Sequence, residues 1–172
     1  HLYCLNIYLR VHSPTILIKK SLLESRSKLD NPVFHSLSEV HQDKGIQYEG
    51  VKFYHPHYCA FGGVTDPQVM SKGLAAYVQL SSAFFIVGET PVFDPSLTLV
   101  KELVCLQMVL DKPIDFNPTQ EIILLESKAQ KQALFELVNL VQPGYFKEKT
   151  VDLGRYYGIY HDHQLVAVYL KP

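Results

Sequence analysis

Cysteine is scarce in this sequence. Cys4, Cys59 and Cys105 are odd in number and far apart, and no C-x-x-C pair occurs among the 172 residues. Neither a disulfide framework nor a zinc cluster is therefore expected. Reduced, unpaired thiols favour a cytoplasmic location.

The sequence also lacks an excess of charge and any long apolar run. The formal net charge is -1, which gives no electrostatic reason to expect nucleic acid or an anionic membrane as a partner. No apolar run reaches the roughly 18 to 20 residues that span a bilayer. His12, Ser13 and Pro14 interrupt the apolar N-terminus where a signal peptide would need a continuous segment. The length and the apolar content of 47% fit a soluble globular protein of one or two domains.

Candidate metal ligands and nucleophiles do not form recognisable sets. His55 and His57 have the spacing of one strand face, but Pro56 between them indicates a turn, and no carboxylate or cysteine completes a ligand set, so no metal site is expected. Cys59 and Cys105 lack a motif that fixes a cysteine-histidine pair, which favours buried structural thiols. The polar run at residues 161–163 is interpreted as a hairpin turn.

In the first half of the sequence, residues 2–11 are predicted to form a strand or a short helix, and residues 15–19 are predicted to form a second strand. Asn31 can cap a helix and Pro32 suits its first position, which predicts a helix over residues 32–41. Its inner face would carry Phe34, Leu37 and Val40 or His41.

A second helix is predicted over residues 66–78, with Asp66 as its cap and Pro67 at its first position. One side of this helix would carry Val69, Met70, Leu74, Tyr77 and Val78. Before it, residues 51–64 are rich in aromatic residues and predict two short strands or one bent strand. After it, residues 83–87 are apolar on both faces and predict an interior strand.

Residues 97–110 fit either a helix or a strand, and the sequence leaves both open. Two prolines mark residues 111–118 as a linker. Residues 122–125 predict a strand, and Ser127 caps a helix that runs to about residue 141. The inward side of this helix would carry Ala129, Ala133, Leu134, Leu137 and Val141.

Pro143 and Gly144 then break the helical pattern, and a β-hairpin is predicted around residues 161–163, with Gly158 and Leu165 in paired antiparallel strands. Alternation predicts that one face of the hairpin buries Tyr157, Ile159, Leu165, Ala167 and Tyr169. Interleaved helices and strands with hairpins indicate an α/β or α+β fold with a mixed, partly antiparallel sheet flanked by helices.

Several short segments resemble a known family in the right order. PGYF, TVDLG, YYGIY and QLVAV are similar to the start of the catalytic half of one branch of the GNAT acyl-CoA N-acyltransferases, and DNPVFHSL and LQMVL resemble the N-terminal part of that branch. The resemblance implies a GNAT-like fold. It divides the chain into an extension (1–30), a degenerate GNAT-like N-terminal half (31–110), a linker (111–118) and the opening elements of a catalytic half (119–172).

The resemblance further implies an acyl-CoA-dependent N-acyltransferase that moves an acetyl group from acetyl-CoA to a small-molecule or peptide amine. Tyr145, Phe146 and Tyr157 resemble residues that line the acceptor pocket in this family, although core or rim packing is an alternative for all three. No residue is assigned as catalytic acid or base.

The family's Arg/Gln-x-x-Gly-x-Gly/Ala loop, which cradles the diphosphate of coenzyme A, does not occur in this sequence. The 172-residue chain is therefore expected to bind acetyl-CoA weakly or not at all. The alternative function is a non-catalytic GNAT-like interaction module whose unpaired hairpin edge is completed by another chain, including a second copy in a homo-oligomer.

Overall fold

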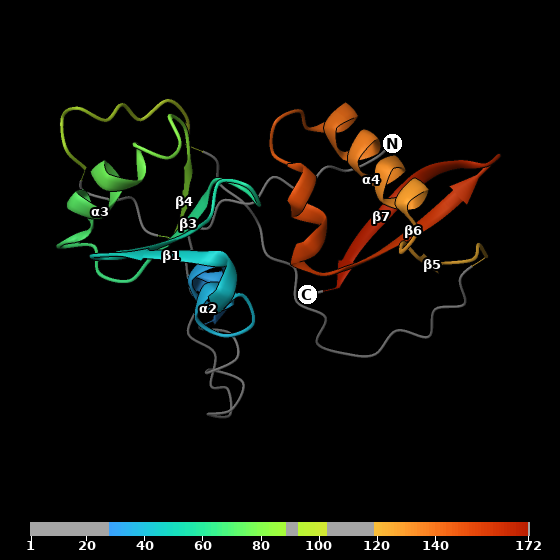
Figure 1. Ribbon diagram of the computed structural model, residues 1–172, viewed down its shortest axis with the longest axis horizontal. Helices are drawn as coiled ribbons and strands as arrows, with labels where there is room; N and C mark the ends of the chain where they lie inside the picture. Colours follow the sequence, from blue (N-terminus) through green and yellow to red (C-terminus); the bar gives the residue numbers. More distant parts are fainter. Residues whose placement is uncertain (1–27, 89–92, 103–118, 172) are drawn as a thin grey trace, which may run out of the picture. The chain divides into compact units, whose positions relative to one another are not determined.

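The computed structural model describes residues 28–88, 93–102 and 119–171 (Figure 1). The chain forms two compact units. Within the described residues, the N-terminal unit comprises residues 28–56, 60–88 and 93–102, and the C-terminal unit comprises residues 57–59 and 119–171. The elements predicted at residues 2–11 and 15–19 and the linker at 111–118 lie outside the described residues. Of the segment 97–110, residues 97–102 form neither helix nor strand, and the remainder also lies outside.

Helix α2 (Pro32–Ser38) of the N-terminal unit begins as predicted. The Asn31 side chain accepts a hydrogen bond from the Phe34 backbone N–H, and Pro32 occupies the first turn. The helix ends three residues before the predicted end at residue 41. Leu37 is buried, whereas Val40, predicted as an alternative inner residue, is 66% exposed.

Four strands form the sheet of this unit in the order β1-β2-β3-β4. Pairing is antiparallel except between β3 and β4, which are parallel. A short 3₁₀ helix, η1 (Gln42–Lys44), leads into the first strand. The strands are β1 (Gly45–Tyr48), β2 (Val51–Tyr54), β3 (Phe61–Val64) and β4 (Phe85–Val87).

Two strand predictions need correction. The sequence did not predict β1, which is held in place by antiparallel pairing with β2. The segment 83–87 was predicted to be an interior strand, but β4 lies at one end of the sheet that the described residues form, and only Val87 of its three residues is buried.

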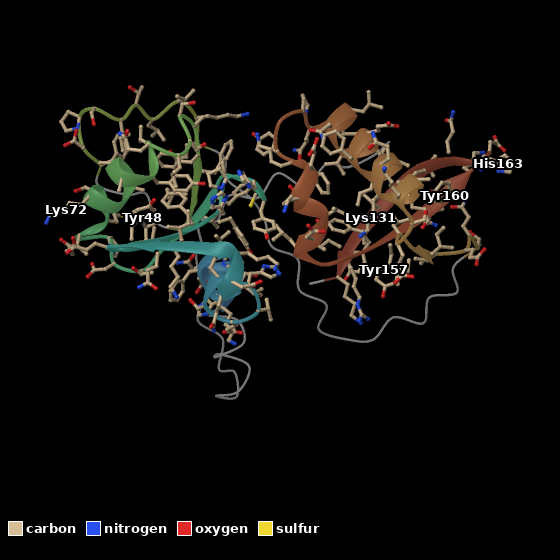
Figure 2. The ribbon with its side chains drawn as sticks, viewed as in Figure 1. Tyr48, Lys72, Lys131, Tyr157, Tyr160 and His163 are labelled. Carbon is tan, nitrogen blue, oxygen red and sulfur yellow. The ribbon has the colours of Figure 1, made fainter. Side chains whose placement is uncertain are left out.

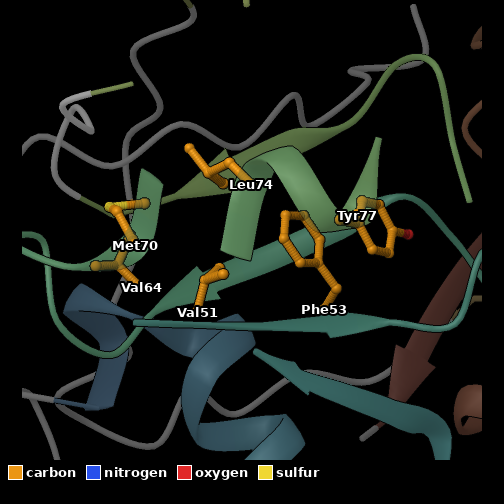
Figure 3. Close-up of a cluster of buried hydrophobic side chains, with 6 residues drawn as sticks. All are labelled: Val51, Phe53, Val64, Met70, Leu74 and Tyr77. Carbon is orange, nitrogen blue, oxygen red and sulfur yellow. The ribbon is translucent and has the colours of Figure 1, made fainter. Parts of the chain in front are cut away.

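Helix α3 (Met70–Tyr77) begins four residues later than predicted. The Asp66 carboxylate instead accepts a hydrogen bond from the Gln68 backbone N–H at 2.9 Å and caps a turn before the helix. Phe53 and Tyr77 stack with their ring centroids 3.7 Å apart, and the Tyr77 hydroxyl donates to the Tyr54 carbonyl. Around this pair α3 and the sheet bury the core of the unit (Figure 3), which consists of Val51, Phe53, Val64, Met70, Leu74 and Tyr77.

The C-terminal unit is an antiparallel sheet in the order β5-β6-β7, with a helix against one face. Figure 1 shows α4 lying across the β6–β7 hairpin. The elements are β5 (Ile123–Leu124), α4 (Lys128–Val141), the 3₁₀ helix η2 (Glu148–Leu153), β6 (Arg155–His161) and β7 (Gln164–Lys171).

Helix α4 confirms the predicted start at Ser127. The Ser127 hydroxyl accepts from the Gln130 backbone N–H, and the Gln130 side chain accepts from the Ser127 backbone N–H, which forms a capping box. Leu134 is completely buried, but Ala129 and Val141, predicted to face inward, are exposed. Ala133 and Leu137 pack against the core as predicted, and Phe135 and Val138, which were not predicted, complete the inward side.

The predicted hairpin is confirmed, with Gly158 and Leu165 in paired antiparallel strands. Asp162 and His163 both have positive φ angles, 47° and 62°, as a tight two-residue hairpin turn requires. A register shift between Ile159 and Tyr160 changes which side chains share a face. As a result Leu165 lies on the face that packs against α4, together with residues 156, 158 and 168. The prediction that Leu165 shares a face with residues 157 and 169 is therefore wrong.

Within residues 28–88, 93–102 and 119–171, no helix combines the length and the apolar character needed to cross a bilayer.

Candidate functional site

The predicted acceptor-side residues begin in the loop that follows α4. Asn139 fastens this loop to the helix: its Nδ2 donates to the carbonyls of Phe135 at 3.0 Å and Phe146 at 3.1 Å, and its Oδ1 accepts from the Gly144 N–H at 3.2 Å. Gly144 has a φ of 89°, which favours glycine. The sequence analysis missed Asn139. The available signal was an amide in the last turns of the helix, just before Pro143 and Gly144.

Phe146 is part of the core of the C-terminal unit. Its side chain is 8% exposed, and its ring lies edge-on to the rings of Phe135, 6.3 Å away, and Tyr156, 5.7 Å away. The Tyr156 hydroxyl donates to the Thr150 carbonyl at 3.1 Å, which ties η2 to β6. The neighbouring Tyr145 is half-buried. For Phe146 this geometry favours the core alternative, because an enclosed ring has little surface to offer a ligand.

Tyr157 lies on β6, on the face of the sheet opposite to α4 (Figure 2). It is half-buried and pairs in register with Tyr169 of β7, with 6.5 Å between the ring centroids; Tyr169 is 62% exposed. The structure therefore places Tyr157 and Phe146 on opposite faces of the sheet. It brings Tyr157 together with Tyr169, and the role of the three predicted residues in acceptor binding stays a prediction.

The face that carries Tyr157 is apolar around the tyrosine pair and only partly covered, and the exposed Arg155 and Lys171 lie opposite each other at one end of it. In the strand register Leu124 lies opposite Tyr157, and Ile159 lies opposite Ala167. These side chains are all half-buried. Such a surface, with a tyrosine pair at its centre, suits the apolar part of a ligand and leaves the two hydroxyl groups for polar contacts.

Shifted pKa values do not identify a catalytic acid or base. The Lys28 ammonium lowers the pKa of the Glu39 carboxyl chiefly by hydrogen bonding to it. Hydrogen bonds from Lys44 and from Ser96 likewise lower the pKa values of Asp43 and Asp94. All three carboxyl groups are exposed and belong to the N-terminal unit, so they are surface ion pairs and turns.

The described residues do not fit the diphosphate of coenzyme A. At the start of α3 the Asp66 carboxylate already accepts from a backbone N–H, which brings a negative charge to the place where a diphosphate would need free N–H donors. At the start of α4 the N–H groups of Glu126 and Ser127 donate to the Gln130 side chain and that of Gln130 donates to the Ser127 hydroxyl, and the exposed Glu126 adds a negative charge there. We therefore derive no chemical step through the cofactor from these residues.

His55, His57 and Cys59, which were considered as metal ligands or as a nucleophile, are among the described residues. No group of three or more histidine, cysteine, aspartate or glutamate side chains in the described part of the chain lies close enough to hold a metal ion. His55 is half-buried and His57 is exposed. Cys59 is buried and forms no disulfide, while Cys4 and Cys105 lie outside the described residues.

Comparison with known proteins gives a structural likeness. No protein-family model and no curated protein matches the chain. The structure is similar to the crystal structure of a putative acetyltransferase from the GNAT family from Novosphingobium aromaticivorans DSM 12444, with a TM-score of 0.64 and 25% sequence identity. The match covers 81% of this chain and 62% of the other, so this chain spans less than two thirds of the length of that protein.

Proposed function

We propose that this chain, whose mixed α+β fold is GNAT-like, functions in an acyl-CoA-dependent N-acyltransferase that transfers an acetyl group to an amine. The observation that carries the proposal is the structural likeness to a GNAT-family protein over 81% of the chain. The order strand, helix, loop and hairpin in the C-terminal unit agrees with the family segment identified from the sequence. The setting that we propose is cytoplasmic.

The role proposed for the described residues is to bind the acceptor. N-acylation by a thioester needs a deprotonated amine, a polarised carbonyl and a stabilised thiolate. Tyr157 and Tyr169 offer ring faces and hydroxyl groups on a partly covered apolar surface, which suits an amine that carries a small apolar group, whether a small molecule or a peptide. Tyr145, at the edge of the loop, is the third proposed contact. Phe146 would act indirectly, by holding that loop in place.

The proposal assigns binding of acetyl-CoA to residues outside those that the structure describes, because the described helix starts do not fit a diphosphate. The 172-residue chain should accordingly bind acetyl-CoA weakly in calorimetry. Micromolar binding by this chain would show that the cofactor site has been misplaced.

The decisive experiment is an acetylation assay on the protein at its natural length, with acetyl-CoA and a panel of primary amines and peptides. Mass spectrometry of the acceptor is the appropriate readout, because it is independent of the protein's own thiols. We expect an acetylated product that requires both substrates. Tyr157→Ala should raise the KM for the amine about tenfold with a smaller change in kcat, since it removes ground-state binding area. His163→Ala, at the exposed turn of the same hairpin, should behave as wild type.

The second candidate is a non-catalytic interaction module. It is favoured by β7, which is the last strand of the sheet order β5-β6-β7 in the described residues and carries the exposed Tyr169 and Leu170. Such an edge can pair with a strand of another chain, including a second copy. Two results together would favour this candidate. The protein at its natural length would show neither acetyl transfer to any acceptor nor acetyl-CoA binding, and it would self-associate in a way that Tyr169→Lys abolishes.

A further inference from the structure

The N-terminal unit contains a groove of about 300 Å³ beside α2 and β1, for which the acyl transfer proposal has no use. Ser38, Gln42, Gln47 and Lys52 give it polar atoms, and Gly45 and the side chain of Leu37 give it an apolar part. The volume is at the lower end of the range for small-molecule sites, which is roughly 300 to 1,000 Å³. The groove is therefore suited to a small polar ligand.

Among the described residues, Lys52 is the only cation that lines this groove. Val51 and Phe53 on either side of it are buried in the core beneath α3, so the alternation of β2 turns the lysine toward the other face, where α2 lies. Its Nζ donates to the Ser38 hydroxyl at 2.9 Å and lies 5.2 Å from the centre of the Phe34 ring. These contacts fix the end of the side chain at the groove.

The Lys52 ammonium lacks a counter-charge in the described part of the chain. Lys28, Lys44 and Lys72 of the same unit each lie within 4.0 Å of a carboxylate, whereas no described carboxylate comes that close to Lys52 Nζ. Lys52 is nevertheless half-buried, and a partly desolvated charge without a counter-charge is costly. Of its three N–H donors, one is used by Ser38 and two are left for a ligand.

Gln47 places a second polar group beside this ammonium. It lies directly opposite Lys52 in the antiparallel register of β1 and β2, so the two side chains stand on the same face with their Cβ atoms about 5 Å apart. Gln47 is exposed, and its amide can turn toward a bound ligand. The Gln42 amide is already engaged, since it donates to the Ser38 carbonyl at 2.5 Å.

We propose that this groove binds a small carboxylic acid, with the carboxylate on Lys52 Nζ and the Gln47 amide and the short hydrocarbon part against Leu37 and Gly45. A carboxylate carries one charge, which one ammonium balances. A phosphate is more highly charged, and its sites usually combine several cations or converging backbone N–H groups, which are not among the groups that line this groove. The proposal is independent of the proposed acyl transfer.

The test is a titration with butyrate, followed in ¹H–¹⁵N NMR spectra at constant ionic strength. We expect saturable shifts of the Gly45, Ile46 and Gln47 amides. Butylamine, which has the same hydrocarbon chain and the opposite charge, should cause none. Inorganic phosphate should bind more weakly than butyrate. Equal shifts with butylamine, stronger binding of phosphate, or no saturable shift with butyrate would each overturn the proposal.

Variants test the role of the lysine. Lys52→Met removes the charge and keeps an unbranched stem, and it should weaken butyrate binding about tenfold or more, whereas Lys52→Arg should keep most of it. Lys72→Met is the matched control: Lys72 (Figure 2) is exposed, 3.8 Å from Glu49, and its loss should leave binding unchanged. Gln47→Ala, on an exposed side chain, should weaken binding severalfold even if Lys52→Met does not fold. The assignment would be contradicted if the Lys52→Met and Lys72→Met proteins bound butyrate equally well. If Lys52→Met does not fold, unchanged butyrate binding by Gln47→Ala would contradict it.

Discussion

Gly63 of β3 allows the start of α2 to lie directly against the sheet, and Gly63→Ala should push the two apart. A Cβ atom at this position would lie 2.7 Å from the Cα of Phe34 and 2.8 Å from the side-chain oxygen of Asn31. Carbon atoms in favourable contact are about 3.5 to 4.0 Å apart, so the helix start would have to move by nearly 1 Å. Because most of the obstruction is backbone, a change of rotamer cannot relieve it.

The expected cost can be estimated from the contacts that such a movement breaks. Overpacking by one methyl group typically costs about 1 to 3 kcal/mol. The same movement would disturb Asn31, whose Oδ1 accepts from the Phe34 N–H and whose Nδ2 donates to the Val64 carbonyl at 2.6 Å, and loss of a helix cap costs about 1 kcal/mol. We therefore expect Gly63→Ala to lower the free energy of unfolding of the N-terminal unit by about 2 to 4 kcal/mol.

The assay is a urea titration followed in ¹H–¹⁵N NMR spectra, so that each unit reports its own transition and a single two-state curve for the whole chain is not assumed. Gly144→Ala is the contrasting control. A Cβ there would meet open space, but the φ of 89° should cost about 1 to 2 kcal/mol, and only in the C-terminal unit. If Gly63→Ala cost less than Gly144→Ala, or left the α2 amide signals in place, the close approach of α2 to β3 would be refuted.

Three further predictions concern single contacts. Leu134→Ala should lower the free energy of unfolding of the C-terminal unit by about 2 to 5 kcal/mol in the same titration. Leu140→Ala, on the same helix but 81% exposed, should change it by less than about 0.5 kcal/mol. Equal effects of the two variants would contradict the placement of α4. Ser127→Ala should cost about 1 kcal/mol through loss of the helix cap and increase hydrogen exchange in the first turn of α4, and unchanged exchange there would count against the capping box. Lys28→Met should raise the pKa of Glu39 toward 4.5, as followed by carboxyl ¹³C shifts. Because the folded-state pKa of Glu39 is lowered, the small stabilisation from this pair is present above the unfolded-state pKa and is lost as the pH falls through the folded-state pKa. An unchanged Glu39 titration in the variant would refute the pairing.

The candidate site could be predicted from the sequence only in part. The PGYF loop and the hairpin were located correctly, because Pro143 and the polar turn are local signals. The separation of Phe146 from Tyr157 could not be predicted, since it depends on which face of β6 each side chain meets. The role of Asn139 as the link between helix and loop requires three hydrogen bonds that form only when the loop folds back. The Lys52 groove depends on α2 covering one face of the sheet, which no segment of the sequence specifies by itself.

The sequence by itself determined the features that depend on neighbouring residues. The starts of α2 and α4 follow from side-chain caps at Asn31 and Ser127, whose partners lie three residues away. Only the tertiary structure decided the features that depend on distant partners. Strand β1 exists because β2 pairs with it, and the faces of the hairpin follow from a register shift between β6 and β7. A helix cap is satisfied within one turn of chain, whereas a strand has no hydrogen-bond partner until another strand lies beside it.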